Sequence, residues 1–298
     1  MRYRPLAHQP MTVSAVSLRL DDAHPRNVSD WTALCTAALD SGVNCFEVAG
    51  RNPALIDGMA QALKTVERRL LFVAWRLGPK TMPAQLAADP FSAAAMESLI
   101  HAVISRTGLE YLDLVQLDDP GQQDLSAEAL AALKRLKAEG RIRMIGIAGE
   151  GEEIDAYIST NAFDLLCTPY SMLSGWRDRR RVRAASERNM SLIGYDFYPE
   201  AMLAVVEATK PKRGLLSWGK KPSTAAKQPY SFLHATTDCT AEEICLAYAL
   251  TEPALATVQV TPDTIAHLED LAAVPDRDLP AGIPAQIEMS RFGEGKTG

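Results

Sequence analysis

Short apolar runs alternate with amphipathic segments along most of this chain. The apolar runs predict buried strands at residues 12–20, 43–49, 69–77, 112–117, 142–147, 164–168, 191–197 and 256–260. Apolar residues at helical spacing predict helices at residues 30–40, 54–67, 83–106, 126–139, 152–159, 176–188, 240–251 and 262–273. Strand and helix therefore alternate with short connections. That order predicts an α/β fold of parallel strands closed into a (β/α)8 TIM barrel.

The length and composition fit one large core. The chain has 298 residues, of which 47% are hydrophobic and 23% are charged. Barrels of this class reach about this length as one domain, so we predict a single barrel over residues 1–275. Residues 276–298 are rich in Pro and Gly, and we expect a flexible tail there. No G-x-G-x-x-G follows the first strand, which disfavours a doubly wound dinucleotide-binding sheet.

Charge and residue usage argue against several classes of protein. The net charge of −6 disfavours nucleic acid as a partner. No apolar run approaches the roughly 18–20 residues of a membrane span, and residues 1–10 lack the apolar stretch of a secretory signal. The five cysteines form no C-x-x-C pair and the five histidines have no ligand spacing, so we predict no metal site. We expect a cytoplasmic protein with reduced thiols.

One predicted strand ends in carboxylates. Residues 112–117 are mainly apolar, and Asp118, Asp119 and Pro120 follow them directly. In (β/α)8 barrels, the residues at the carboxyl ends of the strands are the ones that do chemistry. Asp118 is therefore a candidate functional residue.

Six segments, in this order, resemble the aldo-keto reductase family. They are VSAVSL (13–18), ALDSGVNCFEVA (38–49), GLEYLDLVQLDDP (108–120), ALKRLKAEGRIRMIGIAG (132–149), FDLLCTPYSML (163–173), and LAYALTEPALATV (246–258) with the following HLEDL. The resemblance runs from about residue 2 to residue 273 and implies the same barrel. It also implies reduction of carbonyls by hydride from a nicotinamide cofactor. In the family a tyrosine gives the proton, a lysine and an aspartate tune its pKa, and a histidine orients the carbonyl.

All four catalytic positions implied by this resemblance differ here. Glu47 stands for the aspartate, Asn52 for the tyrosine, Arg76 for the lysine and Asp118 for the histidine. An amide cannot act as a general acid, and arginine keeps its proton. Loss of a general acid costs roughly 10²–10⁴ in rate, so we expect no catalytic residue of the family type. Glu47, Arg76 and Asp118 form either a structural ion-pair network or a new acid–base site.

The resemblance also implies a set of cofactor-binding positions. It places the stacking ring at Tyr195, with Asp196 and Phe197 after it, although Tyr195 could equally be a core residue at a strand end. It places the phosphate loop at Thr261 and Asp263, followed by His267 on the next helix. Asp263 would oppose an adenosine 2′-phosphate. If a dinucleotide binds, we therefore expect NAD(H) to be favoured over NADP(H).

Two basic segments stand out in an acidic chain. Residues 177–183 and 210–227 are rich in Arg and Lys, and the second also contains Leu and Trp. Such segments are either solvated faces or docking surfaces for an acidic protein partner.

The leading hypothesis is a catalytically degenerate aldo-keto reductase homologue that binds NAD(H) and regulates protein partners. In this respect it is similar to NAD(H)-binding bacterial relatives that control the cell cycle and cell division. One alternative is an active NAD(P)H-dependent reductase with a rebuilt site, and another is a non-redox lyase or isomerase.

Overall fold

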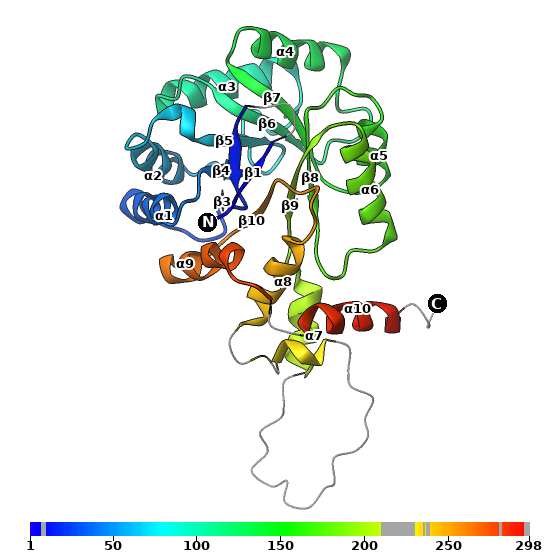
Figure 1. Cartoon of the computed structure of the whole chain (residues 1–298). Helices are drawn as coiled ribbons and strands as arrows, with labels where there is room; N and C mark the ends of the chain where they lie inside the picture. Colours follow the sequence, from blue (N-terminus) through cyan, green and yellow to red (C-terminus); the bar gives the residue numbers. More distant parts are fainter. Residues whose placement is uncertain (7–9, 210–229, 235, 237–238, 280–281, 295–298) are drawn as a thin grey trace, which may run out of the picture.

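A closed barrel of parallel strands forms the centre of the molecule (Figure 1). The computed structural model describes residues 1–6, 10–209, 230–234, 236, 239–279 and 282–294. Within them, eight strands pair in the order β10-β3-β4-β5-β6-β7-β8-β9. They are β3 (Val16–Leu20), β4 (Cys45–Val48), β5 (Phe72–Leu77), β6 (Leu112–Asp118), β7 (Ile142–Ala148), β8 (Leu165–Pro169), β9 (Ser191–Tyr195) and β10 (Thr257–Val260). The predicted (β/α)8 TIM-barrel fold is confirmed.

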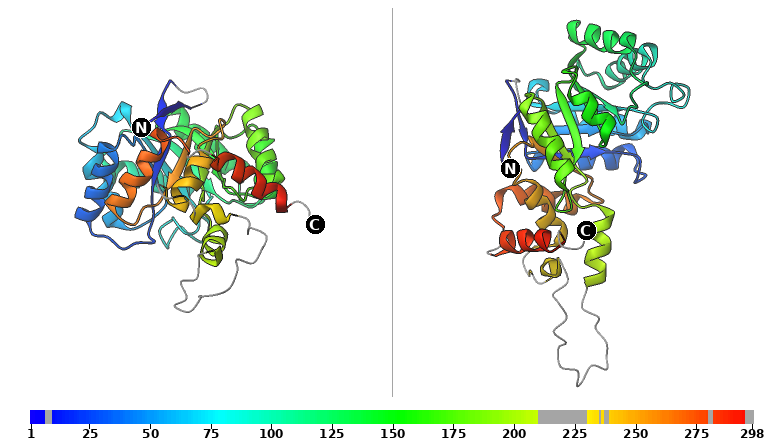
Figure 2. Two further views of the ribbon diagram at one scale, coloured as in Figure 1. Left: turned by 60° about the horizontal axis from the view of Figure 1, so that its bottom comes forward. Right: turned by 90° about the vertical axis from the view of Figure 1, so that its right-hand side faces the viewer.

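Helices lie around the barrel (Figure 2). They are α1 (Val28–Asp40), α2 (Pro53–Leu63), α3 (Ala93–Thr107), α4 (Ala127–Ala138), α5 (Glu152–Ile158), α6 (Trp176–Glu187), α7 (Glu200–Thr209), α8 (Ala241–Ala249), α9 (Ile265–Ala273) and α10 (Ile283–Glu294). Short 3-10 turns lie at η1 (Arg68–Leu70), η2 (Ser231–His234) and η3 (Val274–Asp276). The side chains of Asn27, Asn52, Ser126, Thr240 and Thr264 cap helices by accepting N–H groups of the first turn.

Helix α3 is shorter than the sequence pattern predicts. We expected helix across most of residues 83–106, but α3 begins at Ala93. Pro90 explains the late start, because a proline disfavours helical geometry in the residue before it. Residues 81–92 consist mainly of turns and bends instead.

The barrel separates two apolar cores. The larger one lies between the strands and the helices, and the smaller one fills the barrel interior. Cys45, Phe72, Leu114 and Met144 belong to the inner core, together with Leu6 next to the first strand. A hairpin of β1 (Tyr3–Pro5) and β2 (Thr12–Ser14) thus packs against the amino end of the barrel.

The segment expected as a flexible tail contains a helix. Within residues 276–298, α10 covers Ile283–Glu294, while residues 280–281 and 295–298 lie outside the described part. Ile283 and Ile287 are buried in the outer core, at 4% and 1% exposure. Their spacing of four residues puts both side chains on one face of the helix, which explains why this stretch docks.

Candidate active site at the carboxyl ends of the strands

Three neighbouring strands deliver the charged side chains singled out in the sequence. Glu47 comes from β4, Arg76 from β5 and Asp118 from the end of β6, and these strands are adjacent in the barrel. Glu47 and Arg76 are buried, at 1% and 3% exposure, whereas the Asp118 side chain is 24% exposed. Alternate residues of a strand point into the barrel, so these positions face the same interior space.

Arg76 joins the two carboxylates. Its Nε donates to Glu47 Oε1 at 2.9 Å, and its Nη1 donates to Asp118 Oδ1 at 2.9 Å. Its Nη2 lies 3.4 Å from Cys167 Sγ. Burial alone would lower the pKa of Arg76, but the charges of Glu47 and Asp118 hold that pKa above its ordinary value. The guanidinium is therefore a fixed cation between two anions.

Two glutamines complete the environment of Glu47. The side-chain nitrogens of Gln116 and Gln259 both donate to Glu47 Oε2. Arg19 Nε lies 4.0 Å from the other carboxylate oxygen. Our sequence interpretation did not include Gln116, Gln259 or Arg19. A signal was present, because each is a long polar side chain at an inward position of a barrel strand.

Asn52 has a local structural role. It is the N-cap of α2, and its side-chain oxygen accepts from the Ala54 N–H at 2.9 Å. Its own N–H donates to Asp22 Oδ1 at 3.1 Å, and the N–H of Arg51 donates to Asp22 Oδ2 at 2.9 Å. Asn52, at the position that the resemblance assigns to the proton donor, therefore orders a loop and a helix start.

Tyr195 lies beside the ion-paired cluster. The Arg76 guanidinium carbon is 5.3 Å from the centre of the Tyr195 ring, which is a cation–π distance. Burial raises the pKa of the Tyr195 hydroxyl, which makes it a poorer proton donor near neutral pH. Asp196 follows with a left-handed backbone (φ 51°), and burial raises the pKa of its carboxyl. Phe197 is 6% exposed and packs in the outer core.

A second cluster forms at the loop between β10 and α9. The Asp263 carboxylate lies 3.1 Å from His24 Nε2, and Arg26 Nη2 donates to the Asp263 carbonyl at 2.6 Å. His267 Nδ1 accepts from the Asp263 N–H at 3.3 Å, and its Nε2 lies 3.0 Å from Glu242. Thr261 precedes this loop and is exposed. The loop after the first barrel strand therefore anchors the loop at which the resemblance places the phosphates.

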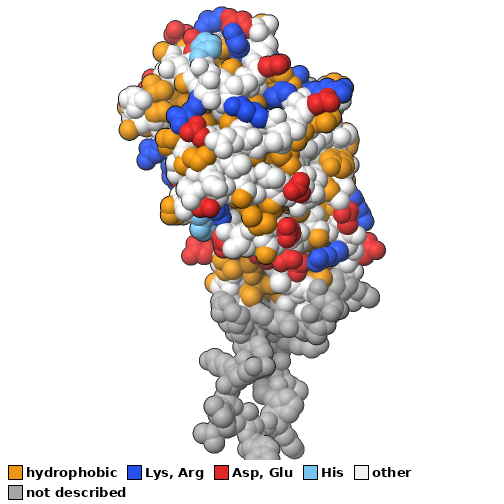
Figure 3. Space-filling model, turned by 90° about the vertical axis from the view of Figure 1, so that its left-hand side faces the viewer, with side chains coloured by type: hydrophobic (Ala, Val, Ile, Leu, Met, Phe, Trp, Pro, Cys, Tyr) orange, Lys and Arg blue, Asp and Glu red, His pale blue; other side chains and the backbone are white. Residues whose placement is uncertain are grey.

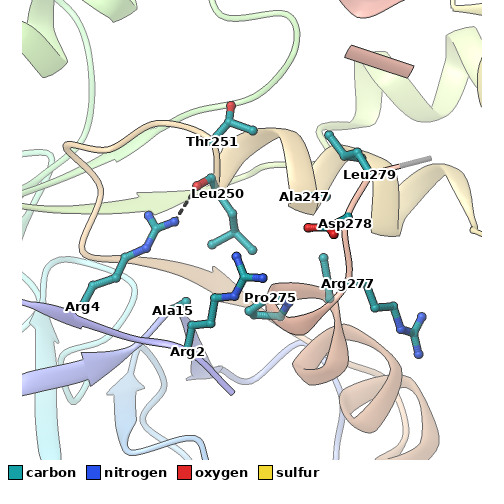
Figure 4. Close-up of a pocket in the computed structure, with 11 residues that line it drawn as sticks. Arg2, Arg4, Ala15, Ala247, Leu250, Thr251, Pro275, Arg277, Asp278 and Leu279 are labelled. Atoms are coloured by element: carbon teal, nitrogen blue, oxygen red, sulfur yellow. Dashed lines mark hydrogen bonds between the residues drawn. The ribbon is translucent and has the colours of Figure 1, made fainter. Parts of the chain in front are cut away.

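Other features lie away from this site. A cavity of about 270 Å³ occupies the amino-end side of the barrel, where Arg2 and Arg4 face Leu250 and Pro275 (Figure 4). Arg4 donates to the carbonyls of Leu250 and Leu255, at 2.5 and 2.8 Å, so it caps the end of α8. In the described part of the chain, no group of three His, Cys, Asp or Glu residues could hold a metal ion. No described helix is long and apolar enough to cross a membrane.

Comparison with known proteins identifies the family. The sequence model of the Aldo/keto reductase family matches residues 21–288. The chain belongs to the aldo/keto reductase family. Among curated proteins, none matches this chain.

Solved aldo-keto reductases share the fold. The holo form of aldo-keto reductase AKR11C1 from Bacillus halodurans is 19% identical with a TM-score of 0.76, over 97% of this chain and 96% of that one. Its apo form has the same identity and coverage with a TM-score of 0.70. The aldo-keto reductase homologue PA4992 from Pseudomonas aeruginosa is 17% identical with a TM-score of 0.66, over 91% of this chain and 93% of that one. At these identities the likeness establishes the fold alone.

Aldo-keto reductases bind nicotinamide cofactors, and the residues present here fit such a group in part. The Tyr195 ring is half-buried at the end of β9, where the resemblance places the stacking ring. At the other predicted contact, His24 Nε2 lies 3.1 Å from the Asp263 carboxylate, and Arg26 Nη2 donates to the Asp263 carbonyl beside the start of α9.

Proposed function

We propose that this aldo-keto reductase is catalytically degenerate and acts as an NAD(H)-binding regulatory protein. The observation that carries the proposal is the pairing of Arg76 with Glu47 and Asp118 at 2.9 Å each. Arg76 stands where the resemblance places the lysine that tunes the proton donor. A guanidinium held between two carboxylates neither shares a proton nor moves without leaving buried charges unpaired.

No side chain at the four family positions is arranged to deliver a proton to a carbonyl. Asn52 is an amide engaged in capping α2. Both oxygens of Glu47 already accept hydrogen bonds from Arg76, Gln116 and Gln259. Asp118 is paired with Arg76, and the raised pKa of Tyr195 keeps its proton on the ring. Hydride transfer without a proton donor would leave an unstabilised alkoxide.

The proposed cofactor is NAD(H) rather than NADP(H). Tyr195 would stack on the nicotinamide, while Asp263 and His267 would lie along the adenosine end. A 2′-phosphate beside the Asp263 carboxylate would add like-charge repulsion, whereas a ribose hydroxyl could donate to that carboxylate. The bound cofactor would be either NAD+ or NADH. The regulatory activity of the protein would then depend on which of these two forms is bound.

Regulation requires a partner, and we propose that the partner is a protein in the cytoplasm. The similarity to degenerate bacterial relatives extends this proposal to the control of the cell cycle or cell division. Basic residues of segment 177–183 lie on α6 and offer a surface for an acidic protein. The second basic segment, 210–227, lies outside the described residues.

Titration of the purified protein with NADH and NADPH tests the cofactor assignment. We expect saturable NADH binding, seen as a change in nucleotide fluorescence and a rise in melting temperature, and at least about tenfold weaker NADPH binding. Asp263→Asn should reduce the difference between the NADH and NADPH affinities, because it removes the charge that opposes the 2′-phosphate. Lys134→Ala on α4 is a control that should leave both affinities unchanged. Absence of binding for both nucleotides would overturn the NAD(H) proposal.

A further inference from the structure

A groove runs between α5 and α6. Its volume is about 520 Å³, and α5 and α6 contact each other along it. These helices lie at the right of Figure 1, away from the face seen in Figure 3, where acidic and basic side chains are interspersed. The residues that line the groove include Glu152, Asp155, Trp176, Arg177, Arg180 and Arg188.

The arginines of α6 fall into two groups. Arg181 is 5% exposed and is paired with Asp155 at 2.7 Å and Asp178 at 3.4 Å. Arg179 donates to the Tyr248 hydroxyl at 2.6 Å. These two side chains therefore hold α6 against its neighbours. Arg177 and Arg180 are exposed, and within the described residues neither forms an ion pair with a carboxylate.

Trp176 adds a large apolar surface to this charge. Its side chain is 67% exposed at the start of α6, and the Arg177 guanidinium carbon lies 5.5 Å from the ring centre. An indole left in water gives up much of the free energy that its burial would yield. Trp and Arg are also the residue types most often found at binding hot spots in protein interfaces. Together they form a preformed apolar and cationic anchor.

We infer that the groove between α5 and α6 docks an acidic protein segment that carries a bulky apolar side chain. The apolar side chain would pack on Trp176, and carboxylates would pair with Arg177, Arg180 and Arg188. Glu152 and Asp155 lie on the opposite wall, and their carboxylate oxygens can accept N–H groups from the peptide backbone of the bound segment. This inference rests on the proposed regulatory function, because it names the chemistry of the partner.

Binding of a synthetic probe to the full chain tests the groove. The probe is a fluorescein-labelled, glutamate-rich peptide with a central leucine and phenylalanine, followed by fluorescence anisotropy. We expect saturable binding that weakens with added salt. Trp176→Ala, and the double change of Arg177→Glu and Arg180→Glu, should each raise Kd by about tenfold or more.

Matched controls separate the groove from general charge effects. Arg183→Glu changes an exposed arginine of the same helix that does not line the groove, and Met289→Ala removes an exposed apolar side chain of α10. Both should leave Kd within about twofold, and circular dichroism should show all variants folded. The inference is overturned if binding of the peptide does not saturate, or if Arg183→Glu weakens peptide binding as much as the changes in the groove do. It is also overturned if an oligothymidylate binds as tightly as the peptide.

NADH affinity, measured on the same protein samples, separates this inference from the proposed function. Peptide binding without NADH binding would support the groove and contradict the NAD(H) proposal. NADH binding without peptide binding would contradict the groove alone.

Discussion

Arg76 joins the charged groups of the candidate active site. It is 3% exposed and satisfies the buried carboxylate of Glu47 and the rim carboxylate of Asp118. The same guanidinium faces the Tyr195 ring. Arg76 pairs with both carboxylates at the barrel mouth, and in the proposed function it also takes the place of the lysine on which family chemistry depends. Its structural and functional effects therefore have one cause.

Replacement of Arg76 should be strongly destabilising. Arg76→Ala leaves Glu47 buried without its cation, so we expect the free energy of unfolding to fall by about 3–5 kcal/mol. Chemical denaturation measures this change. Arg69→Ala is the control, because Arg69 is 79% exposed and, among the described residues, its one ion pair is with the exposed Glu67. A loss below about 1 kcal/mol for Arg76→Ala would mean that the ion pairs do not carry the stability assigned to them.

At the scale of single elements, the sequence predicts those strands and helices that depend on the local spacing of apolar residues. The strands and most helices follow from apolar spacing, and the ends of β4, β5 and β6 place Glu47, Arg76 and Asp118 on neighbouring strands. Gln116 on β6 and Gln259 on β10 are each one strand removed from β4, so their contact with Glu47 across the interior depends on barrel closure and was not predicted. The contact of His24 with Asp263 joins the loop after β3 to the loop after β10 and was missed for the same reason.

Helix α10 shows how composition can mislead at this scale. The Pro and Gly content of residues 276–298 favoured a flexible tail, whereas Ile283 and Ile287 dock part of it on the core. Docking depends on tertiary contacts that a window of local sequence does not contain.

Removal of the docking side chain should measure how firmly α10 is held. Ile287 is 1% exposed, so Ile287→Ala should lower the free energy of unfolding by about 2–5 kcal/mol. Met289, at 66% exposure on the same helix, is the matched control, and Met289→Ala should change stability by less than about 0.5 kcal/mol. Equal effects of the two changes would show that α10 does not bury Ile287 in solution.

At the scale of the whole molecule, the fold does not determine the activity. The chain belongs to the aldo/keto reductase family and closes the same parallel barrel. A barrel supplies strand ends at one rim but does not determine the chemistry there. Here the rim carries an ion-paired Arg76 and an Asn52 that caps a helix. We therefore expect a protein that keeps the shape of a reductase and works by binding.

The proposed absence of carbonyl reduction can be tested with a single measurement. The protein is saturated with NADH, mixed with a panel of aldehydes and ketones, and followed by the loss of NADH absorbance, with an active aldo-keto reductase run in parallel. We expect no oxidation of NADH above the rate measured without protein. Oxidation at ordinary enzyme rates, roughly 1–10³ per second, would contradict it and would assign a working acid to the rebuilt barrel mouth.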